Sequence, residues 1–380
     1  MNHRSYALFL FVLVMALAAC GAAATPTAAP VQPTTAAVPP TAAAPAATAA
    51  ATPLPVAPTA AIVAPTAVPP TAAPAVKLNV VSSVAPLVNI IFNIAGDKVQ
   101  VVGIIPEGTD SHTFEPAPSD AVKMSKADVM FFNGLDLELP TIKLANANKK
   151  PSAQIVILGE QTIKPDQYQY DFSFPKENGH PNPHLWMNPM NALRYGEIVK
   201  DTLSARDAAN AAVYQANYDK FKQRITDLDA AITKTLNSIP PNNRKLLTYH
   251  DSFAYFVVRY PTMKVIGAIQ PSSFGEPSAQ EVAKLIKQIK AEKVPAIFGS
   301  EVFPSKVLEQ IAKESGAKFI DKLRDDELPG NRGDKNHSYV GLMVEDVTVM
   351  TTALGGDPKP MAPIDTTNVT GGDTAVDQTK

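Results

Sequence analysis

The sequence predicts an α/β fold in which two similar lobes enclose a cleft and are joined by a long helix. Short β-branched runs alternate with helical stretches, a pattern typical of parallel sheets covered by helices. The pattern occurs twice with the same rhythm, and a long charged helical region separates the two occurrences. Ligands of such sheets bind at the carboxyl ends of the strands, so the cleft is the expected site.

Each lobe is expected to hold four strands. In the N-terminal lobe, residues 77–206, they are Lys77–Ser82, Lys98–Ile105, Asp128–Asn133 and Gln154–Leu158. In the C-terminal lobe, residues 241–354, they are Lys245–Tyr249, Met263–Ile269, Ala296–Phe298 and Lys318–Ile320. The helices expected between them are Pro86–Ala95, Pro118–Ala127, Ser252–Tyr260, Ser278–Glu292, Pro304–Ser315 and Ser338–Leu354.

The region from Pro189 to Leu236 joins the lobes and is expected to break near Ser204–Asp207, where Ser and Asp can cap a second helix. The connecting helix, residues 207–240, carries apolar residues at helical spacing: Tyr218, Phe221, Ile225, Leu228 and Ile232. This spacing predicts a rod that lies along both lobes.

The first 20 residues have the pattern of a secretory signal. An apolar run of about ten residues is too short for a membrane span, which needs roughly 20. Small residues precede Cys20, the only Cys of the chain, and this ending resembles a bacterial lipobox. The expectation is cleavage before Cys20 and lipid attachment to its thiol, which anchors the protein to a membrane. The alternative is an ordinary signal with an incidental Cys.

Two segments are expected to remain outside the fold. Residues 21–76 contain Ala, Thr, Pro and Val without any charged residue, which predicts a disordered, extended tether that could reach on the order of 150 Å. Residues 355–380 lack apolar periodicity and are expected to form a disordered tail.

Composition excludes several functions. The net charge of -2 lacks the basic surplus of a nucleic-acid binder. A single Cys excludes a disulfide framework and a Cys-rich zinc cluster. The protein is expected to be a monomer.

Three histidines and one acid lie where ligands of a parallel sheet are expected. His250 and Asp321 directly follow predicted strands, whereas His112 and His184 lie in loops. Three imidazoles and one carboxylate form a closed tetrahedral set for a divalent ion such as Zn²⁺. Spacing alone is weak evidence, since the four are remote in sequence and a loop His is commonly a surface residue.

The motifs around these residues are more specific. They are GTDSHTFEPAPSD at 108–120, PHLWMNP at 183–189, YHDSFAYF at 249–256 and FIDKL at 319–323. Together they resemble the ligand loops of the metal-binding substrate-binding proteins of zinc and manganese ABC importers, the cluster 9 or A-I family. Further matching stretches lie at 94–97, 127–138, 276–278 and 338–339. The resemblance runs from about Lys77 to Leu354.

The resemblance implies two lobes of four-stranded parallel sheet flanked by helices, a rigid connecting helix, and one metal ion in the cleft. The implied ligands are His112, His184, His250 and Asp321. It also implies delivery of the ion to a membrane permease energised by ATP hydrolysis on another chain. The second loop departs from the family, because Asn182 and Asn188 stand where Asp is usual.

Four further acids are candidates for supporting the ligands. Asp110, Glu115 and Asp251 can orient the imidazole rings as hydrogen-bond acceptors, or they are solvated loop carboxylates or turn caps. Glu301 follows an apolar strand and is either a buried structural carboxylate or a direct metal contact. Trp186 is expected to pack behind the ligand loop.

The expected function is therefore capture of a divalent metal, with Zn²⁺ favoured over Mn²⁺ because three nitrogen donors suit zinc. Catalysis is not expected, since four protein ligands leave no open position. Rival hypotheses are a zinc hydrolase, a surface adhesin in which the metal is structural, and a lipoprotein that binds an organic ligand. Neither a His-Glu-x-x-His helix nor a Gly-x-Ser-x-Gly elbow supports the hydrolase.

Overall fold

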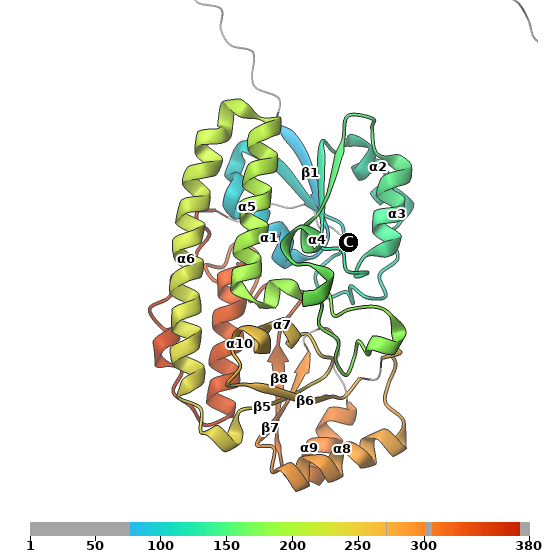
Figure 1. The fold of residues 1–380 in the computed structure, drawn as a ribbon, viewed down its shortest axis with the longest axis vertical. Coiled ribbons are helices and arrows are strands. Elements are labelled where there is room, and N and C mark those ends of the chain that lie inside the picture. Colours follow the sequence, from blue (N-terminus) through green and yellow to red (C-terminus); the bar gives the residue numbers. More distant parts are fainter. Residues whose placement is uncertain (1–76, 271, 301, 303–305, 373–380) are drawn as a thin grey trace, which may run out of the picture. The chain divides into compact units, whose positions relative to one another are not determined.

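The computed structural model describes residues 77–270, 272–300, 302 and 306–372. These residues form two four-stranded parallel sheets with the same topology (Figure 1). The strand order is β2-β1-β3-β4 in the first sheet and β6-β5-β7-β8 in the second. The α/β class and the two similar lobes expected from the sequence are confirmed.

The first sheet contains β1 (Leu78–Ser82), β2 (Val99–Gly103), β3 (Val129–Phe132) and β4 (Gln154–Ile157). The helices of this lobe are α1 (Ala85–Ala95), α2 (Pro118–Lys126), α3 (Leu139–Asn148) and the short α4 (Leu158–Thr162). Successive residues of β1 face opposite cores: Val80 packs with α1, and Val81 packs with Met124 of α2 and Ala145 of α3. Both faces of the sheet are thus covered, which is why its strands are predominantly apolar.

The second sheet contains β5 (Lys245–Thr248), β6 (Lys264–Ala268), β7 (Ala296–Ser300) and β8 (Lys318–Leu323). Its helices are α7 (Ala254–Arg259), α8 (Ala279–Glu292), α9 (Lys306–Ser315) and α10 (Tyr339–Ala353). The same two-sided burial recurs, since Leu247 packs in a core with Leu285 of α8 and Ile311 of α9. Its neighbour Leu246 belongs to the core that extends through the first lobe.

Two long helices connect the sheets. Helix α5 (Pro189–Arg206) ends where the break was expected, and α6 (Ala211–Asn237) packs against α1, α5 and α10 (Figure 1). The five apolar residues at helical spacing on α6 are all buried, from Tyr218 to Ile232. Because this stripe contacts helices of both lobes, it forms one continuous core between them.

All eight strands expected from the sequence are present, with ends shifted by a few residues. The largest shift is at β8, which continues to Leu323 instead of ending at Ile320. Helices α3 and α4 were not anticipated. Helix α3 begins with Leu139-Pro140 and has apolar residues on no single face, so its sequence gives little periodic signal.

The segment 355–372 differs from the disordered tail that the sequence predicts. It contains a 3₁₀ turn at Lys359–Met361 and packs onto the N-terminal lobe. The Oδ1 atom of Asn368 accepts hydrogen bonds from Asn89 and Asn93 of α1, at 3.0 Å each. Met361 of this segment is buried in the core, and Ile364 and Val369 pack against it. Three apolar residues are too few to give the periodic pattern of a helix or strand. The signal sequence, Cys20 and the tether lie outside the described residues.

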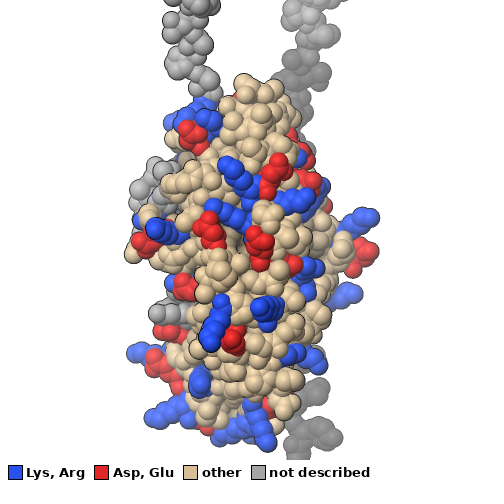
Figure 2. Space-filling view, turned by 90° about the vertical axis from the view of Figure 1, so that its left-hand side faces the viewer, with Lys and Arg blue, Asp and Glu red and all other residues tan. Residues whose placement is uncertain are grey.

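No helix within the described ranges has the length and apolarity needed to span a bilayer. On the face shown in Figure 2, basic and acidic side chains are interspersed and neither sign forms a continuous stripe.

Candidate metal site

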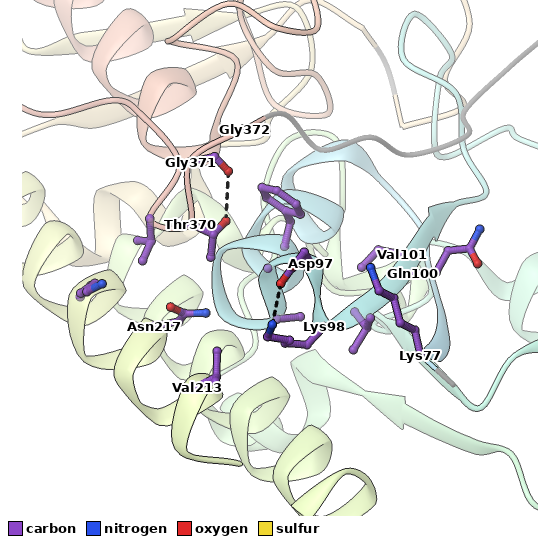
Figure 3. Close-up of a pocket in the computed structure, with 16 residues that line it drawn as sticks. Lys77, Asp97, Lys98, Gln100, Val101, Val213, Asn217, Thr370, Gly371 and Gly372 are labelled. Atoms are coloured by element: carbon purple, nitrogen blue, oxygen red, sulfur yellow. Dashed lines mark hydrogen bonds and ion pairs between the residues drawn. The ribbon is translucent and has the colours of Figure 1, made fainter. Parts of the chain in front are cut away.

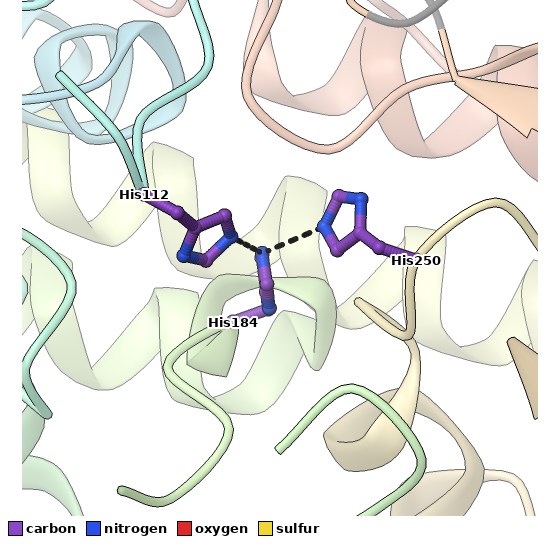
Figure 4. A group of neighbouring side chains, drawn as sticks. All are labelled: His112, His184 and His250. Carbon is purple, nitrogen blue, oxygen red and sulfur yellow. Dashed lines mark hydrogen bonds between the residues drawn. The ribbon is translucent and has the colours of Figure 1, made fainter. Parts of the chain in front are cut away.

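Three histidines remote in sequence meet at one point (Figure 4). The Nε2 atom of His184 lies 3.2 Å from Nε2 of His112 and 3.3 Å from Nε2 of His250. Two ligands of a tetrahedral zinc ion, each about 2.0–2.1 Å from the metal, lie roughly 3.3–3.4 Å apart. The ring nitrogens therefore already have the spacing that a single small cation requires.

Each histidine reaches this point from a different part of the fold. His112 lies in the loop after β2, and His250 lies just beyond β5. His184 immediately precedes the 3₁₀ turn Leu185–Met187 and helix α5. Both sheets thus present a loop from the carboxyl end of a strand, and the connecting region supplies the third ring. This arrangement agrees with the rule for ligand sites in open parallel sheets.

The carboxylate beside these rings belongs to Asp325. Its Oδ2 atom lies 2.9 Å from Nε2 of His250 and 4.0 Å from Nε2 of His184. Asp321, which the sequence assigned to this position, is exposed on strand β8. The structure thus brings the three predicted histidines together but replaces the predicted acid by another.

The length of β8 explains this correction. The sequence predicts a strand that ends at Ile320, which makes Asp321 the first residue beyond it. The strand instead pairs with β7 up to Leu323, across an irregularity between the pairs Phe298–Ile320 and Ser300–Leu323. Asp321 is therefore inside an edge strand, and the first acidic residue beyond its carboxyl end is Asp325.

The His184 ring is held by a hydrogen-bond chain that the sequence did not reveal. Its Nδ1–H donates to Oδ1 of Asn182 at 2.9 Å, and its backbone N–H donates to the same oxygen. The amide Nδ2 of Asn182 in turn donates to Oδ2 of Asp171, at 2.7 Å. With Nδ1 protonated, a neutral ring presents the lone pair of Nε2 to the site. Asn182, a departure from the usual Asp of the second loop, thus fixes the orientation of the His184 ring.

The other candidate acids have different partners. Asp110 accepts hydrogen bonds from the backbone N–H of His112 and the hydroxyl of Thr113, so it caps the turn that carries His112. Asp251 is buried, and its carboxylate accepts from the backbone N–H of Phe253 at 3.3 Å. Glu115 is exposed, and Glu301 lies outside the described residues.

The histidines differ in their affinity for protons. Burial and the charge of His250 lower the pKa of His112 to about 3. Burial, together with both neighbouring rings, lowers the pKa of His184 well below its usual value. Burial also disfavours the charged form of His250, but the adjacent Asp325 carboxylate outweighs this and raises its pKa to about 9. Among the three rings, the raised pKa of His250 makes it the one that favours the protonated form at neutral pH.

Aromatic side chains surround the rings. Trp186 is fully buried, as expected, with its ring centroid 5.2 Å from that of His184. Its Nε1–H donates to the backbone carbonyl of Asp325 at 2.8 Å. Phe174 lies 5.4 Å from the His112 ring, centroid to centroid. These contacts restrict water and fix the rings, which favours tight binding of an ion.

The remaining histidines of the described chain do not belong to this cluster. His180 is exposed and its Nδ1 is 2.7 Å from Oδ2 of Asp136. His337 is buried just before α10, and its Nδ1–H donates to the carbonyl of Pro329. A separate cavity of about 890 Å³ lies between the end of α1, β2, α6 and residues 369–372 (Figure 3). Asp97 and Lys98 form an ion pair there, and the cavity contains no histidine.

Comparisons with known proteins show the family of this chain. The family model described as the periplasmic component A of the zinc-uptake complex matches residues 80–353. The iron-binding protein YfeA of Yersinia pestis is 32% identical over 282 residues, which cover 74% of this chain and 87% of that protein. The manganese ABC transporter substrate-binding lipoprotein PsaA of Streptococcus pneumoniae is 28% identical, with 70% and 86% covered.

Solved structures show the same fold. The periplasmic zinc-binding protein TroA of Treponema pallidum superimposes with a TM-score of 0.66 at 26% identity, covering 73% of this chain and 99% of that one. A manganese-bound periplasmic metal-binding protein from Candidatus Liberibacter asiaticus gives 0.64 at 26% identity, with 73% and 100% covered. The names of these relatives include zinc, manganese and iron, so the family as a whole is not restricted to one metal.

Proposed function

This chain belongs to the family of periplasmic zinc-uptake components, and we propose that it captures Zn²⁺ in preference to Mn²⁺. Its relatives include metal ABC transporter substrate-binding lipoproteins. The proposed ligands are Nε2 of His112, His184 and His250 and a carboxylate oxygen of Asp325. The ion is the cargo, which the protein passes to the membrane permease of an ABC importer.

The observation that carries this proposal is the convergence of three Nε2 atoms on one point beside a buried carboxylate. Three imidazoles and a single carboxylate favour zinc, whereas manganese prefers a larger share of oxygen ligands. Four protein ligands also fill a tetrahedral shell, which leaves no position for a reactive water. The site therefore suits binding and release of the ion rather than hydrolysis.

The N-terminal segments complete the proposal. Lipid attached to Cys20 would anchor the protein at the extracytoplasmic face of the cell membrane, and residues 21–76 would form a spacer between membrane and lobes. The names of several relatives describe lipoproteins, which supports such an anchor. A monomer is sufficient, since all four proposed ligands come from one chain.

Calorimetric titration of the chelator-stripped protein tests the proposal. We expect one Zn²⁺ per chain, and we expect Zn²⁺ to displace Mn²⁺ when the two are offered together. The metal content of protein purified without added metal, measured by mass spectrometry, gives an independent reading. Tighter binding of Mn²⁺ than of Zn²⁺ would contradict the proposed selectivity, and absence of stoichiometric binding would contradict the site itself.

Zinc affinity is expected to rise with pH. The pKa of His250 is raised to about 9, so below this pH the ion must displace a proton, whereas His112 and His184 are already neutral. One displaced proton gives an association constant that rises about tenfold per pH unit between about pH 6 and 8. Titrations in two buffers of different ionisation enthalpy measure this proton directly. A pH-independent association constant over this range would contradict the assigned charge of His250.

A further inference from the structure

An aromatic side chain from the C-terminal lobe covers a ligand of the N-terminal lobe. Phe274 lies between β6 and α8, and its ring stacks on that of His112 with centroids 4.9 Å apart and planes 17° apart. It also lies 5.7 Å from the ring of Phe174. His112 is thus contacted by two phenylalanines, of which only Phe274 belongs to the opposite lobe.

The backbone of Phe274 adopts a conformation that bulky residues avoid. Its φ of 58° lies in the left-handed region, where the side chain crowds the following carbonyl oxygen. The position is held by a hydrogen bond in which Nε2 of the buried Gln270 donates to the carbonyl of Phe274, at 3.0 Å. Such conformations persist only where surrounding contacts impose them, and they cluster at clamps and switch regions.

Phe274 lies beside a cavity that reaches His112. Phe274 and His112 both line a cavity of about 230 Å³, together with Ser173, Phe174 and His180. His184 and His250 are buried, whereas His112 retains partial exposure. His112 is therefore the ligand nearest to solvent, and Phe274 covers the ring that an entering or leaving ion would pass.

We propose that Phe274 is a gating residue that controls how fast the metal ion exchanges, by stacking on His112 when the lobes are closed. An imidazole bound to a divalent ion carries more positive charge than a free one, so it attracts the face of an aromatic ring more strongly. Binding thus favours the closed position of Phe274. The positive φ of Phe274 is unfavourable and opposes the closed position. The gate therefore opens when Phe274 loses its contact with His112 of the other lobe. This inference rests on the proposed function and adds a kinetic role.

Stopped-flow measurement of zinc release from the full chain into excess EDTA tests the gate. The Phe274→Leu variant keeps an apolar side chain but removes the aromatic face, and we expect its dissociation rate constant to rise roughly three- to tenfold. The association rate constant should not fall, and the stoichiometry should remain one. Phe274→Tyr retains the ring and should release zinc at close to the wild-type rate.

Two further variants separate gating from a general loss of packing. Phe172→Leu is a matched control, because Phe172 is an exposed phenylalanine two residues from Phe174. It should leave the release rate unchanged. Gln270→Ala removes the hydrogen bond to the carbonyl of Phe274 but keeps the Phe274 ring. This variant should accelerate zinc release as Phe274→Leu does.

The outcomes distinguish the gate from the function on which it rests. If wild-type protein binds no stoichiometric Zn²⁺, the proposed function fails. If it binds Zn²⁺ but Phe274→Leu releases it at the rate of Phe172→Leu, only the gate is overturned. Equal acceleration by Phe274→Tyr and Phe274→Leu would also overturn it, because the aromatic face would then be irrelevant.

Discussion

Replacing Asp325 with Asn is expected to lower zinc affinity by at least about 100-fold. Loss of a residue that only hydrogen-bonds to a metal ligand costs roughly 10- to 100-fold in affinity, and loss of a proposed ligand itself should cost more. Replacing Asp321 with Asn is expected to leave the affinity within about threefold, since an exposed charge contributes little. The two changes are chemically identical and lie four residues apart. Competition calorimetry against a chelator of known affinity measures both.

The position of Asp325 accounts for the size of the effect. Its Oδ2 lies 2.9 Å from Nε2 of His250, and the residue is buried. Burial disfavours the ionised carboxylate, but the charge and the hydrogen bond of His250 outweigh it and hold the pKa of Asp325 below its usual value. The carboxylate is therefore ionised. Asn keeps the shape but removes the negative charge that lies at hydrogen-bond distance from a ring nitrogen of the cluster.

A second measurement distinguishes loss of the carboxylate from misfolding of the Asp325→Asn variant. Without the Asp325 carboxylate, burial should lower the pKa of His250, so the metal would no longer displace a proton. Zinc binding by Asp325→Asn should therefore release less than one proton at neutral pH, whereas Asp321→Asn should release one, as the wild type does. If Asp321→Asn proved the more damaging change, the sequence-based assignment would be right and the placement of Asp325 wrong.

The fold could be predicted to a large extent because its signals are local. Each β-branched run forms a strand of one of the two sheets, and the apolar stripe of α6 faces the core that joins the lobes. Two of the three histidines could also be predicted from local signals. His112 and His250 follow strands β2 and β5, and the carboxyl ends of parallel strands define where ligands meet.

The details that escaped prediction depend on contacts between distant residues. The end of β8 is set by its pairing with β7, which the sequence of β8 alone does not reveal. Nothing near Asn182 indicates that its amide would bridge His184 and Asp171. Residues 355–372 are held by polar bonds from Asn368 to α1 and by the scattered apolar residues Met361, Ile364 and Val369, and neither gives a periodic hydrophobic pattern.

Replacing Trp186 with Ala is expected to reduce the free energy of unfolding by about 3–5 kcal/mol, the usual cost of removing a large buried aromatic ring. Trp186 is the largest fully buried side chain of the described residues and packs in the core shared by both lobes. Its backbone carbonyl accepts a hydrogen bond from the hydroxyl of Tyr339 on α10, at 2.6 Å. Urea unfolding of the metal-free protein, followed by circular dichroism, measures the loss.

Trp186→Phe distinguishes the cost of a cavity in the core from the cost of losing the indole hydrogen bond to Asp325. Phe fills most of the space, but it leaves the carbonyl of Asp325 without the indole N–H that binds it at 2.8 Å. Leaving a buried acceptor unsatisfied costs about 1–3 kcal/mol, so this variant should be destabilised less than Trp186→Ala. Because the lost bond holds the backbone of a proposed ligand, zinc affinity should also fall in Trp186→Phe. Unchanged affinity in a destabilised Phe variant would show that Trp186 supports the core alone and that Asp325 is positioned by other contacts.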